Sequence, residues 1–319
     1  MIILLRTSLA AIGRYGTEGF ALSIFLGLAL PQFAATARPV LPITIFCFMV
    51  VVFLRADFTV IAGLVRRPKV LLLSCLWLIA APALLVLAVV SVLGRGALDP
   101  GLLLGLAILG AAPPIMSSPA VAILYGFEPS LIIASVLTIT ILSPLIAPVL
   151  VDVLAGQAVP LDASVLFGRL AIFVGGGMII AFSLRRWLGR GTITAMKAEL
   201  DGFGVIMYFI FAIAAMDGVT VAVLEDPGFV AMTLAILFAL ALFSIGLGLV
   251  ALRFAAPSDR FILGYAGAQR NMGLLVAALG AGVPAKTFLF FALAQFPIYL
   301  LPWLLKPLAA FVRRRMGTP

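Results

Sequence analysis

The 319-residue chain is 64% hydrophobic and 10% charged, with a mean hydropathy of +1.29. Because about a quarter of the residues in an average soluble domain are charged, this composition excludes an ordinary soluble domain and predicts an integral membrane protein. The net charge of +9 does not indicate nucleic-acid binding, since the basic residues stand singly or in short clusters between apolar stretches. No histidine is present and the two cysteines lie isolated in apolar runs, so neither a metal site nor a disulfide framework is predicted.

Residues 1–18 contain Arg6 and Arg14 and predict an interfacial segment ahead of the first membrane span. Ten apolar runs follow, each of roughly the length that a helix needs to cross the hydrocarbon core. These runs are Gly19–Thr36, Pro39–Leu54, Val70–Leu93, Gly101–Tyr125, Pro129–Val151, Ser164–Leu184, Gly202–Val221, Gly228–Leu252, Arg260–Val283 and Thr287–Val312.

The basic residues sort strongly between the two sides of these ten spans. If both termini share a side, that side carries 16 of the 21 basic residues and the other side carries four, with Arg270 inside a span. By the positive-inside rule, both termini are predicted to be cytoplasmic, in a multi-pass protein of the cell (inner) membrane. The four on the opposite side are Arg38, Arg95, Arg169 and Lys286.

The fourth run is interrupted by prolines and hydroxyl groups. Pro113, Pro114 and Pro119 cannot donate backbone hydrogen bonds, and Ser117 and Ser118 are polar. Taken alone, this pattern is also compatible with an ordinary proline kink, since proline is common in membrane helices.

The ninth run carries a charge, Arg270, between Gln269 and Asn271. A charge at membrane depth is costly, so it usually faces a protein interior or a water-filled cavity and marks a ligand or ion path. Each interrupted run is the fourth in a half of five, over residues 19–155 and 160–312. Paired interruptions at equivalent places predict two inverted five-helix repeats whose broken helices meet near the bilayer midplane.

Arg270 has no carboxylate partner at that depth, because all twelve acidic residues lie at or near predicted span ends. An unpaired buried charge is strongly disfavoured. Three groups can compensate it: the carbonyls at the C-terminal end of a half-helix, water in a cavity, or an anionic substrate held by the guanidinium.

Four motifs occur in order along the spans: RRPKV at residues 66–70, GAAPPIMSS at 110–118, SPLIAP at 143–148 and QRNMGL at 269–274. Together they resemble the bile acid:sodium symporter family over about residues 39–308. The resemblance implies an all-helical fold of ten spans, in which a core domain (spans three to five and eight to ten) moves against a panel domain (spans one, two, six and seven). Broken helices four and nine would cross in the core. The implied function is uptake of an organic anion, such as a bile acid or another carboxylate, driven by sodium held beside the crossing.

The chain departs from the family at the positions that the resemblance assigns to sodium ligands. The resemblance implies a glutamate where this chain has Ala266, or Tyr265 with a one-residue insertion, and an asparagine where it has Pro119. It implies two hydroxyl residues at Ile132 and Val136, and a glutamine at Trp77. Because sodium prefers oxygen ligands, a divergent bacterial-type member without sodium coupling is predicted.

The leading interpretation is a secondary transporter of a small organic anion that needs no cofactor, with Arg270 supplying the charge that sodium supplies in relatives. A channel or structural membrane protein, in which Arg270 only links helices, is the alternative. Import and export both stay open, and an enzyme is disfavoured because no carboxylate pair lies inside the membrane. The expected partners are the anion and the lipid bilayer. The candidate substrate-binding residues are Pro113, Pro114, Ser117, Ser118, Tyr265, Gln269, Arg270 and Asn271.

Overall fold

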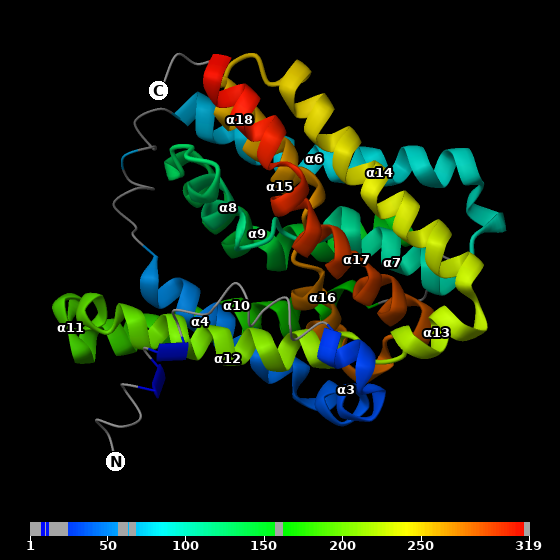
Figure 1. The fold of residues 1–319 in the computed structure, drawn as a ribbon, viewed down its shortest axis with the longest axis horizontal. Helices are drawn as coiled ribbons and strands as arrows, with labels where there is room; N and C mark the ends of the chain where they lie inside the picture. Colours follow the sequence, from blue (N-terminus) through cyan, green and yellow to red (C-terminus); the bar gives the residue numbers. More distant parts are fainter. Residues whose placement is uncertain are drawn as a thin grey trace. The chain divides into compact units, whose positions relative to one another are not determined.

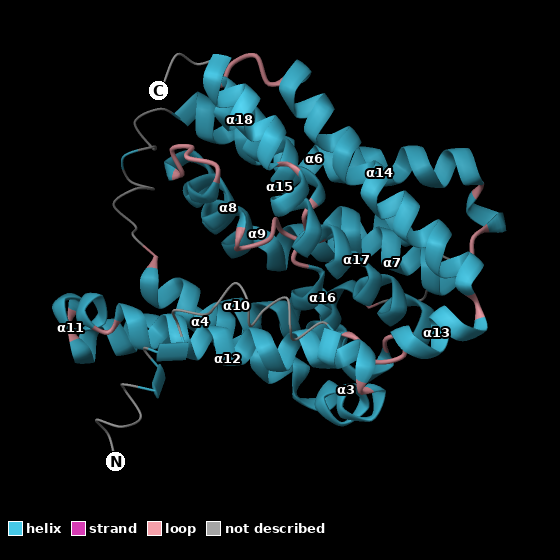
Figure 2. Cartoon of the chain, in the orientation of Figure 1, coloured by secondary structure: helices cyan, strands magenta, loops and turns pink. Residues whose placement is uncertain are grey.

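The computed structural model describes residues 25–56, 68–156 and 162–315, together with positions 8, 9, 11, 12 and 63. The described chain is built from helices and their connections (Figure 2). Its one β-type pairing is an isolated bridge between Pro114 and Arg270. Most of the predicted interfacial segment, the beginning of the first run, and Arg66 and Arg67 of the RRPKV motif lie outside the described residues.

Seven helical stretches in the described part are long and apolar enough to cross a membrane, which confirms the predicted all-helical membrane class. In chain order (Figure 1) they are α3–η1–α4 (Pro31–Ala37, Arg38–Val40, Leu41–Arg55), α6 (Pro68–Leu93), α9 (Ser130–Ala155), α10 (Ala163–Leu188), α12 with α13 (Lys197–Ala215, Val219–Glu225), α14 (Pro227–Ala251) and α17 (Ala285–Leu304).

The fourth and ninth predicted runs are each divided into two shorter helices. The fourth forms α7 (Pro100–Ala111) and α8 (Ser118–Leu124), and the ninth forms α15 (Pro257–Ala268) and α16 (Met272–Leu279). The remaining described elements are η2 (Arg95–Ala97), α11 (Arg190–Ala195), η4 (Gly280–Gly282) and α18 (Lys306–Arg315).

The predicted boundary between the first two spans is wrong. The chain around Pro39 lies inside a helical stretch, and the helix is interrupted earlier, at Leu30, where φ is −129° and ψ is 68°. Leu30 precedes Pro31, and a residue before proline is disfavoured in the α-helical region because it clashes with the proline ring. Pro39 stands in the first turn of η1, where the fixed φ of proline suits a helix start.

The tenth predicted span, Thr287–Val312, is also too long. Helix α17 ends at Leu304, and the separate helix α18 begins at Lys306. In α18, Ala309 and Val312 are buried while three arginines occupy the last turn. This one-sided burial explains why the apolar run continues in the sequence although the membrane helix has ended.

The described helices form two compact units. The first unit comprises the described residues within 1–56, 169–230 and 277–281, and the second comprises those within 57–168, 231–276 and 282–319.

Within the first unit, α12 runs antiparallel to α4 and packs against α3, η1 and α4. Ion pairs join both ends of this arrangement. Arg38 Nη1 lies 2.9 Å from Asp217 Oδ2, and Arg55 pairs with Asp201 at the other end. These partly exposed pairs contribute little stability each, so they chiefly set the register of α12 against α4.

Within the second unit, α7 is the central helix, with residues Gly101–Ala111 all buried among α6, α9 and α17. Its beginning is joined to the beginning of α17: Thr287 Oγ1 donates to the Gly101 carbonyl at 2.7 Å, and Lys286 Nζ lies 2.9 Å from Asp99 Oδ2. The hydrogen bond from Lys286 lowers the pKa of the Asp99 carboxyl group. Helices α7 and α17 therefore run side by side in the same direction.

Helices α14 and α15 approach closely because glycines face one another. A Cβ atom added to Gly248 would lie 2.7 Å from Gly264 Cα and 2.9 Å from the carbonyl oxygen of Arg260. Small residues let membrane helices approach at backbone distance. A hydrogen bond also joins the two helices, because Ser244 Oγ donates to the Gly264 carbonyl at 2.8 Å.

We expect Gly248→Ala to lower the melting temperature of the purified protein by several degrees, because the added methyl group meets backbone atoms and overpacking costs about 1–3 kcal/mol. Gly246→Ala is the matched control in the same helix, since a Cβ there meets no atom within 4 Å. The control should melt at or slightly above the wild-type temperature, because alanine favours helix. Equal melting of the two variants would contradict this close approach.

Candidate functional site

The two helix breaks of the second unit meet each other through their backbones. The Asn271 amide donates to the Pro113 carbonyl at 2.8 Å, and the Ile115 amide donates to the Gln269 carbonyl at 2.8 Å. Pro114 and Arg270 face each other between these two hydrogen bonds. Each break thus satisfies polar groups of the other, as backbone at membrane depth requires.

The sequence dictates the conformation of the first break. Ala112 precedes Pro113 and has the extended angles φ −60° and ψ 148° that a residue before proline favours. Two consecutive prolines then provide no N–H groups, so the α7 ladder cannot continue. The chain becomes helical again at Ser118.

Arg270 is buried within this crossing, with 2% of its surface exposed. Its Nη1 donates to the Leu78 carbonyl of α6 at 2.8 Å and lies 3.5 Å from the Ala266 carbonyl. Ala266 is in the last turn of α15, whose carbonyls lack intrahelical donors and form the negative end of the helix dipole. Of the three predicted kinds of compensation, helix carbonyls are therefore present.

The Leu78 carbonyl is available because of Pro82, a residue that the sequence analysis did not single out. In a regular helix the N–H four residues further along donates to each carbonyl, and Pro82 has none. The Arg270 guanidinium takes the place of that missing donor. A proline inside a span, four residues after a carbonyl, is the signal that could have indicated such an acceptor.

A pocket in the second unit lies beside Arg270. Gln269 and Arg270 are its charged or amide-bearing lining residues, and both are almost fully buried. Arg270 Nε and Gln269 Nε2 have no hydrogen-bond partner among the described residues. The rest of the lining is Pro82, Leu85, Val86, Leu109, Leu237, Leu240, Gly267, Ala268, Met272, Ala294, Pro297 and Ile298.

The other predicted substrate-binding residues occupy different places. Pro113 and Pro114 form the crossing itself, and Asn271 is half-buried beside it, but none of the three lines the pocket. Ser117 precedes α8 and Ser118 begins it; the Ser118 hydroxyl is buried and has no hydrogen-bond partner in the described part of the chain. The structure therefore brings Gln269 and Arg270 together at one pocket and leaves the serines outside its lining.

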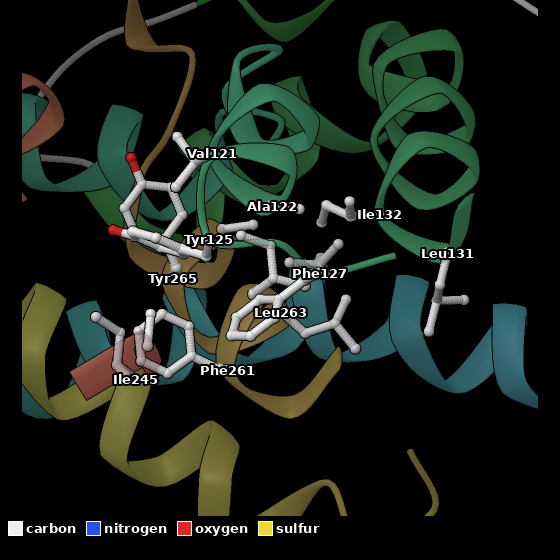
Figure 3. Close-up of a cluster of buried hydrophobic side chains, with 14 of the residues drawn as sticks. Val121, Ala122, Tyr125, Phe127, Leu131, Ile132, Ile245, Phe261, Leu263 and Tyr265 are labelled. Carbon is white, nitrogen blue, oxygen red and sulfur yellow. The ribbon is translucent and has the colours of Figure 1, made fainter. Parts of the chain in front are cut away.

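Tyr265 belongs to a continuous cluster of buried apolar residues in the second unit, which we call the apolar cluster. Figure 3 shows Tyr265 beside Tyr125 in this cluster, with Phe261 and Ile245 below them. The Tyr265 hydroxyl has no hydrogen-bond partner among the described residues. Its ring is surrounded by packing contacts and does not line the pocket.

Most positions that the resemblance assigns to sodium ligands lie in the same apolar cluster. Ile132, Val136 and Ala266 are members of it, and Trp77 packs against it (Figure 3 labels Ile132). The Trp77 indole N–H donates to the Leu263 carbonyl at 3.1 Å, so Trp77 provides a donor rather than an oxygen ligand. Because sodium requires several oxygen ligands, the side chains at these positions do not fit the ion.

A family model described as the sodium bile acid symporter family matches residues 42–225, more than half of the chain. The chain belongs to this family. Its members are transporters, and the family assignment made from the four motifs is confirmed. The match includes α7, α8 and the break between them, but it ends before α15 and Arg270. No curated protein matches the chain.

The pairing of Arg270 with the carbonyl released by Pro82 predicts a rescue. Arg270→Gln should lower the melting temperature, because Leu78 and Ala266 lose the donor between them. Adding Pro82→Ala should restore several degrees to that variant, since residue 82 then donates to Leu78 within the helix, a bond worth about 1 kcal/mol. In the wild-type background the same change should help less, because the Leu78 carbonyl is already paired.

Pro148→Ala in α9 is the control, because Pro148 is also buried inside a helix but does not line the pocket. Its effect on the melting temperature should be the same with either residue at position 270. Equal effects of Pro82→Ala in both backgrounds would show that Leu78 and Arg270 are not energetically coupled.

Proposed function

We propose that this member of the sodium bile acid symporter family is a secondary transporter of a small organic anion that works without sodium coupling. The main support for this proposal is the buried guanidinium of Arg270. It donates to the Leu78 carbonyl at the point where the two helix breaks pair. A fixed positive charge there attracts an anion without help from a bound cation.

The apolar cluster supports the absence of sodium coupling. Where relatives are expected to provide oxygen ligands, this chain has Ile132, Val136 and Ala266 packed in a buried apolar environment. A desolvated cation in such surroundings is strongly disfavoured unless it is paired. Transport is then driven by the gradient of the anion itself (facilitated diffusion) or by a proton gradient. The fold permits either import or export.

Alternating access of a core domain against a panel domain is the mechanism that we propose. Most described residues of the segments predicted for the panel, spans one, two, six and seven, lie in the first unit, and most of spans three to five and eight to ten lie in the second. The exceptions are residues 164–168 of span six, 228–230 of span eight and 277–281 of span nine. This division supports ten spans in two inverted five-helix repeats, over residues 19–155 and 160–312, with α7–α8 and α15–α16 as the equivalent broken helices.

We propose that the protein lies in the inner membrane, with both termini in the cytoplasm. The 16-to-4 distribution of basic residues favours it. Three ion pairs inside the units support it as well, because each joins ends predicted on the same side. These pairs are Arg38–Asp217 and Asp99–Lys286 outside, and Arg55–Asp201 inside.

A structural role for Arg270 is the second candidate, and one observation favours it: both of its hydrogen-bond acceptors are protein carbonyls. In that case the protein is a channel or a structural membrane protein. Arg270→Lys separates the two candidates. Lysine keeps the charge but loses the planar fork, so anion transport should weaken partly under our proposal, whereas a purely structural residue would change the melting temperature without changing anion selectivity.

Sodium independence is tested by transport in proteoliposomes, with a panel of carboxylates and with sodium exchanged for potassium at constant ionic strength. We expect saturable anion uptake at the same rate in both salts, because the positive charge beside the crossing belongs to the Arg270 side chain and needs no bound sodium. A saturable sodium requirement would show that backbone oxygens rebuild the ion site and would overturn the proposal.

The orientation is tested by reporter fusions after Gly191 and after Arg315. Both fusions should give a cytoplasmic signal, since each follows a basic cluster and an even number of spans separates them. A periplasmic signal from either fusion would overturn the topology and with it the pairing of the fourth and ninth spans.

A further inference from the structure

Helix α18 carries four basic residues that have no acidic partner in the described part of the chain. They are Lys306, Arg313, Arg314 and Arg315. No aspartate or glutamate occurs in residues 285–315, which form α17 and α18. By contrast, Arg260 of the neighbouring helix α15 donates to the carbonyls of Ala255 and Arg253. The charges of α18 are therefore available to an anion from outside the chain.

Two of these cations lie against exposed aromatic rings. Lys306 Nζ is 4.1 Å from the centroid of the Trp303 ring, and Arg315 Cζ is 4.6 Å from that of the Phe311 ring. Trp303 is 72% exposed and Phe311 is 51% exposed. A ring face attracts a cation and holds it in position, while the N–H groups at the edge of a guanidinium stay free to donate to a phosphate. The rings therefore keep both cations at the surface with donors unused.

Helix α18 has a buried side and an exposed apolar side. Ala309 and Val312 belong to the apolar cluster. Leu308 and Phe311 are exposed, and they share a helix face with Arg315, because residues spaced i, i+3 and i+7 lie along one face. Exposed apolar, aromatic and basic side chains together are typical of a helix at the boundary between membrane and water. The position of α18 directly after the membrane-spanning helix α17 agrees with this.

We propose that α18 and the end of α17 bind an anionic phospholipid. Its phosphate accepts hydrogen bonds from Lys306 or Arg315, and its acyl chains lie against the exposed side chains of Leu304 and Leu308. An anionic headgroup is favoured over a zwitterionic one, because this surface has cations but no carboxylate to pair with a headgroup nitrogen. The inference goes beyond the proposed function, since it concerns a lipid partner and holds whichever anion is transported.

Stabilisation of α18 itself is a simpler role for its arginines, because cations in the last turn of a helix interact favourably with the helix dipole. Arg313 and Arg315 both stand in that turn. They differ in their surroundings, since a Cβ atom added to Gly126 would lie 2.8 Å from Arg313 Nη1. The Arg313 guanidinium is thus directed at the turn after α8, and Arg313 is a matched control for Arg315.

The test measures lipid binding to the purified full chain in a nonionic detergent by native mass spectrometry. Phosphatidylglycerol and phosphatidylcholine with identical acyl chains are titrated separately. Phosphatidylglycerol should bind at least about fivefold more tightly, because the attraction of one Lys or Arg to anionic lipid corresponds to about that factor. Equal binding of the two lipids would overturn the proposal.

Two arginine variants locate the binding surface. Arg315→Gln should lose about fivefold in phosphatidylglycerol affinity while phosphatidylcholine affinity stays unchanged. Arg313→Gln should bind both lipids as the wild type does, although it removes the same charge from the same turn. An equal loss in the two variants would show that only net charge matters, and no loss in Arg315→Gln would place the lipid elsewhere. Either result would overturn the assignment.

The melting temperature gives a second readout for the same variants. Without lipid, Arg313→Gln and Arg315→Gln should melt at the same temperature, because each removes one cation from the last turn. Phosphatidylglycerol should then raise the melting temperature of Arg313→Gln more than that of Arg315→Gln. Equal stabilisation of both variants would contradict a site at Arg315.

Glycerol 3-phosphate separates a lipid surface from a site for a soluble anion. It has the phosphate without the acyl chains, so it should bind much more weakly than phosphatidylglycerol at the same salt concentration. Binding at least as tight as that of phosphatidylglycerol would overturn the lipid proposal. Higher ionic strength should reduce the preference for phosphatidylglycerol, because exposed charges are screened by salt. A preference that did not change with salt would contradict the role of these cations.

Discussion

The site depends on one constraint: backbone polar groups inside a bilayer must find partners within the protein. Proline at positions 113 and 114 removes donors from one helix, and the second break at Gln269–Asn271 supplies the replacement. The two reciprocal hydrogen bonds of 2.8 Å connect α7–α8 with α15–α16. Because each break is incomplete without the other, any movement that separated them would expose unpaired groups at membrane depth.

Arg270 extends the same constraint from the backbone to a charge. Its guanidinium connects the crossing to α6 through a carbonyl that Pro82 leaves unpaired. A mobile ion in this region would need a cage of oxygen atoms, whereas the Arg270 guanidinium is held in place by its own chain and by two carbonyls. The apolar residues Ile132, Val136 and Ala266, at positions that the resemblance assigns to sodium ligands, are compatible with such a tethered cation, because no cage is then required. The close approach of Gly248 and Gly264 places α15, the helix that ends just before Arg270, at backbone distance from α14.

Features set by local chemistry were predictable from the sequence. The apolar runs predicted membrane helices, the paired prolines predicted one break, and the charge of Arg270 among small residues predicted the other. Features that depend on contacts between distant segments were not. The bond from Arg270 to Leu78 spans 192 positions, and no pattern near Leu78 indicates its partner. Tyr265 illustrates the same limit, because a polar aromatic residue near a break is equally compatible with a ligand site and with the packing that the structure has.

The helix boundaries also divide into those set by local rules and those set by contacts between distant segments. The helix interruption at Leu30 follows a local rule about residues before proline, which hydropathy alone does not contain. The end of α17 before Lys306 depends on which side of α18 packs against α15, a tertiary contact that hydropathy does not encode.

The central claim, that Arg270 is a built-in cation at the crossing, is tested most directly by chemical rescue. The melting temperature of purified Arg270→Ala is measured with and without methylguanidinium, at concentrations too low to affect the wild type. The account predicts that methylguanidinium raises the melting temperature of Arg270→Ala and that sodium does not, since the vacated site presents two carbonyls rather than an ion cage. Stabilisation of the variant by sodium but not by methylguanidinium would contradict the account.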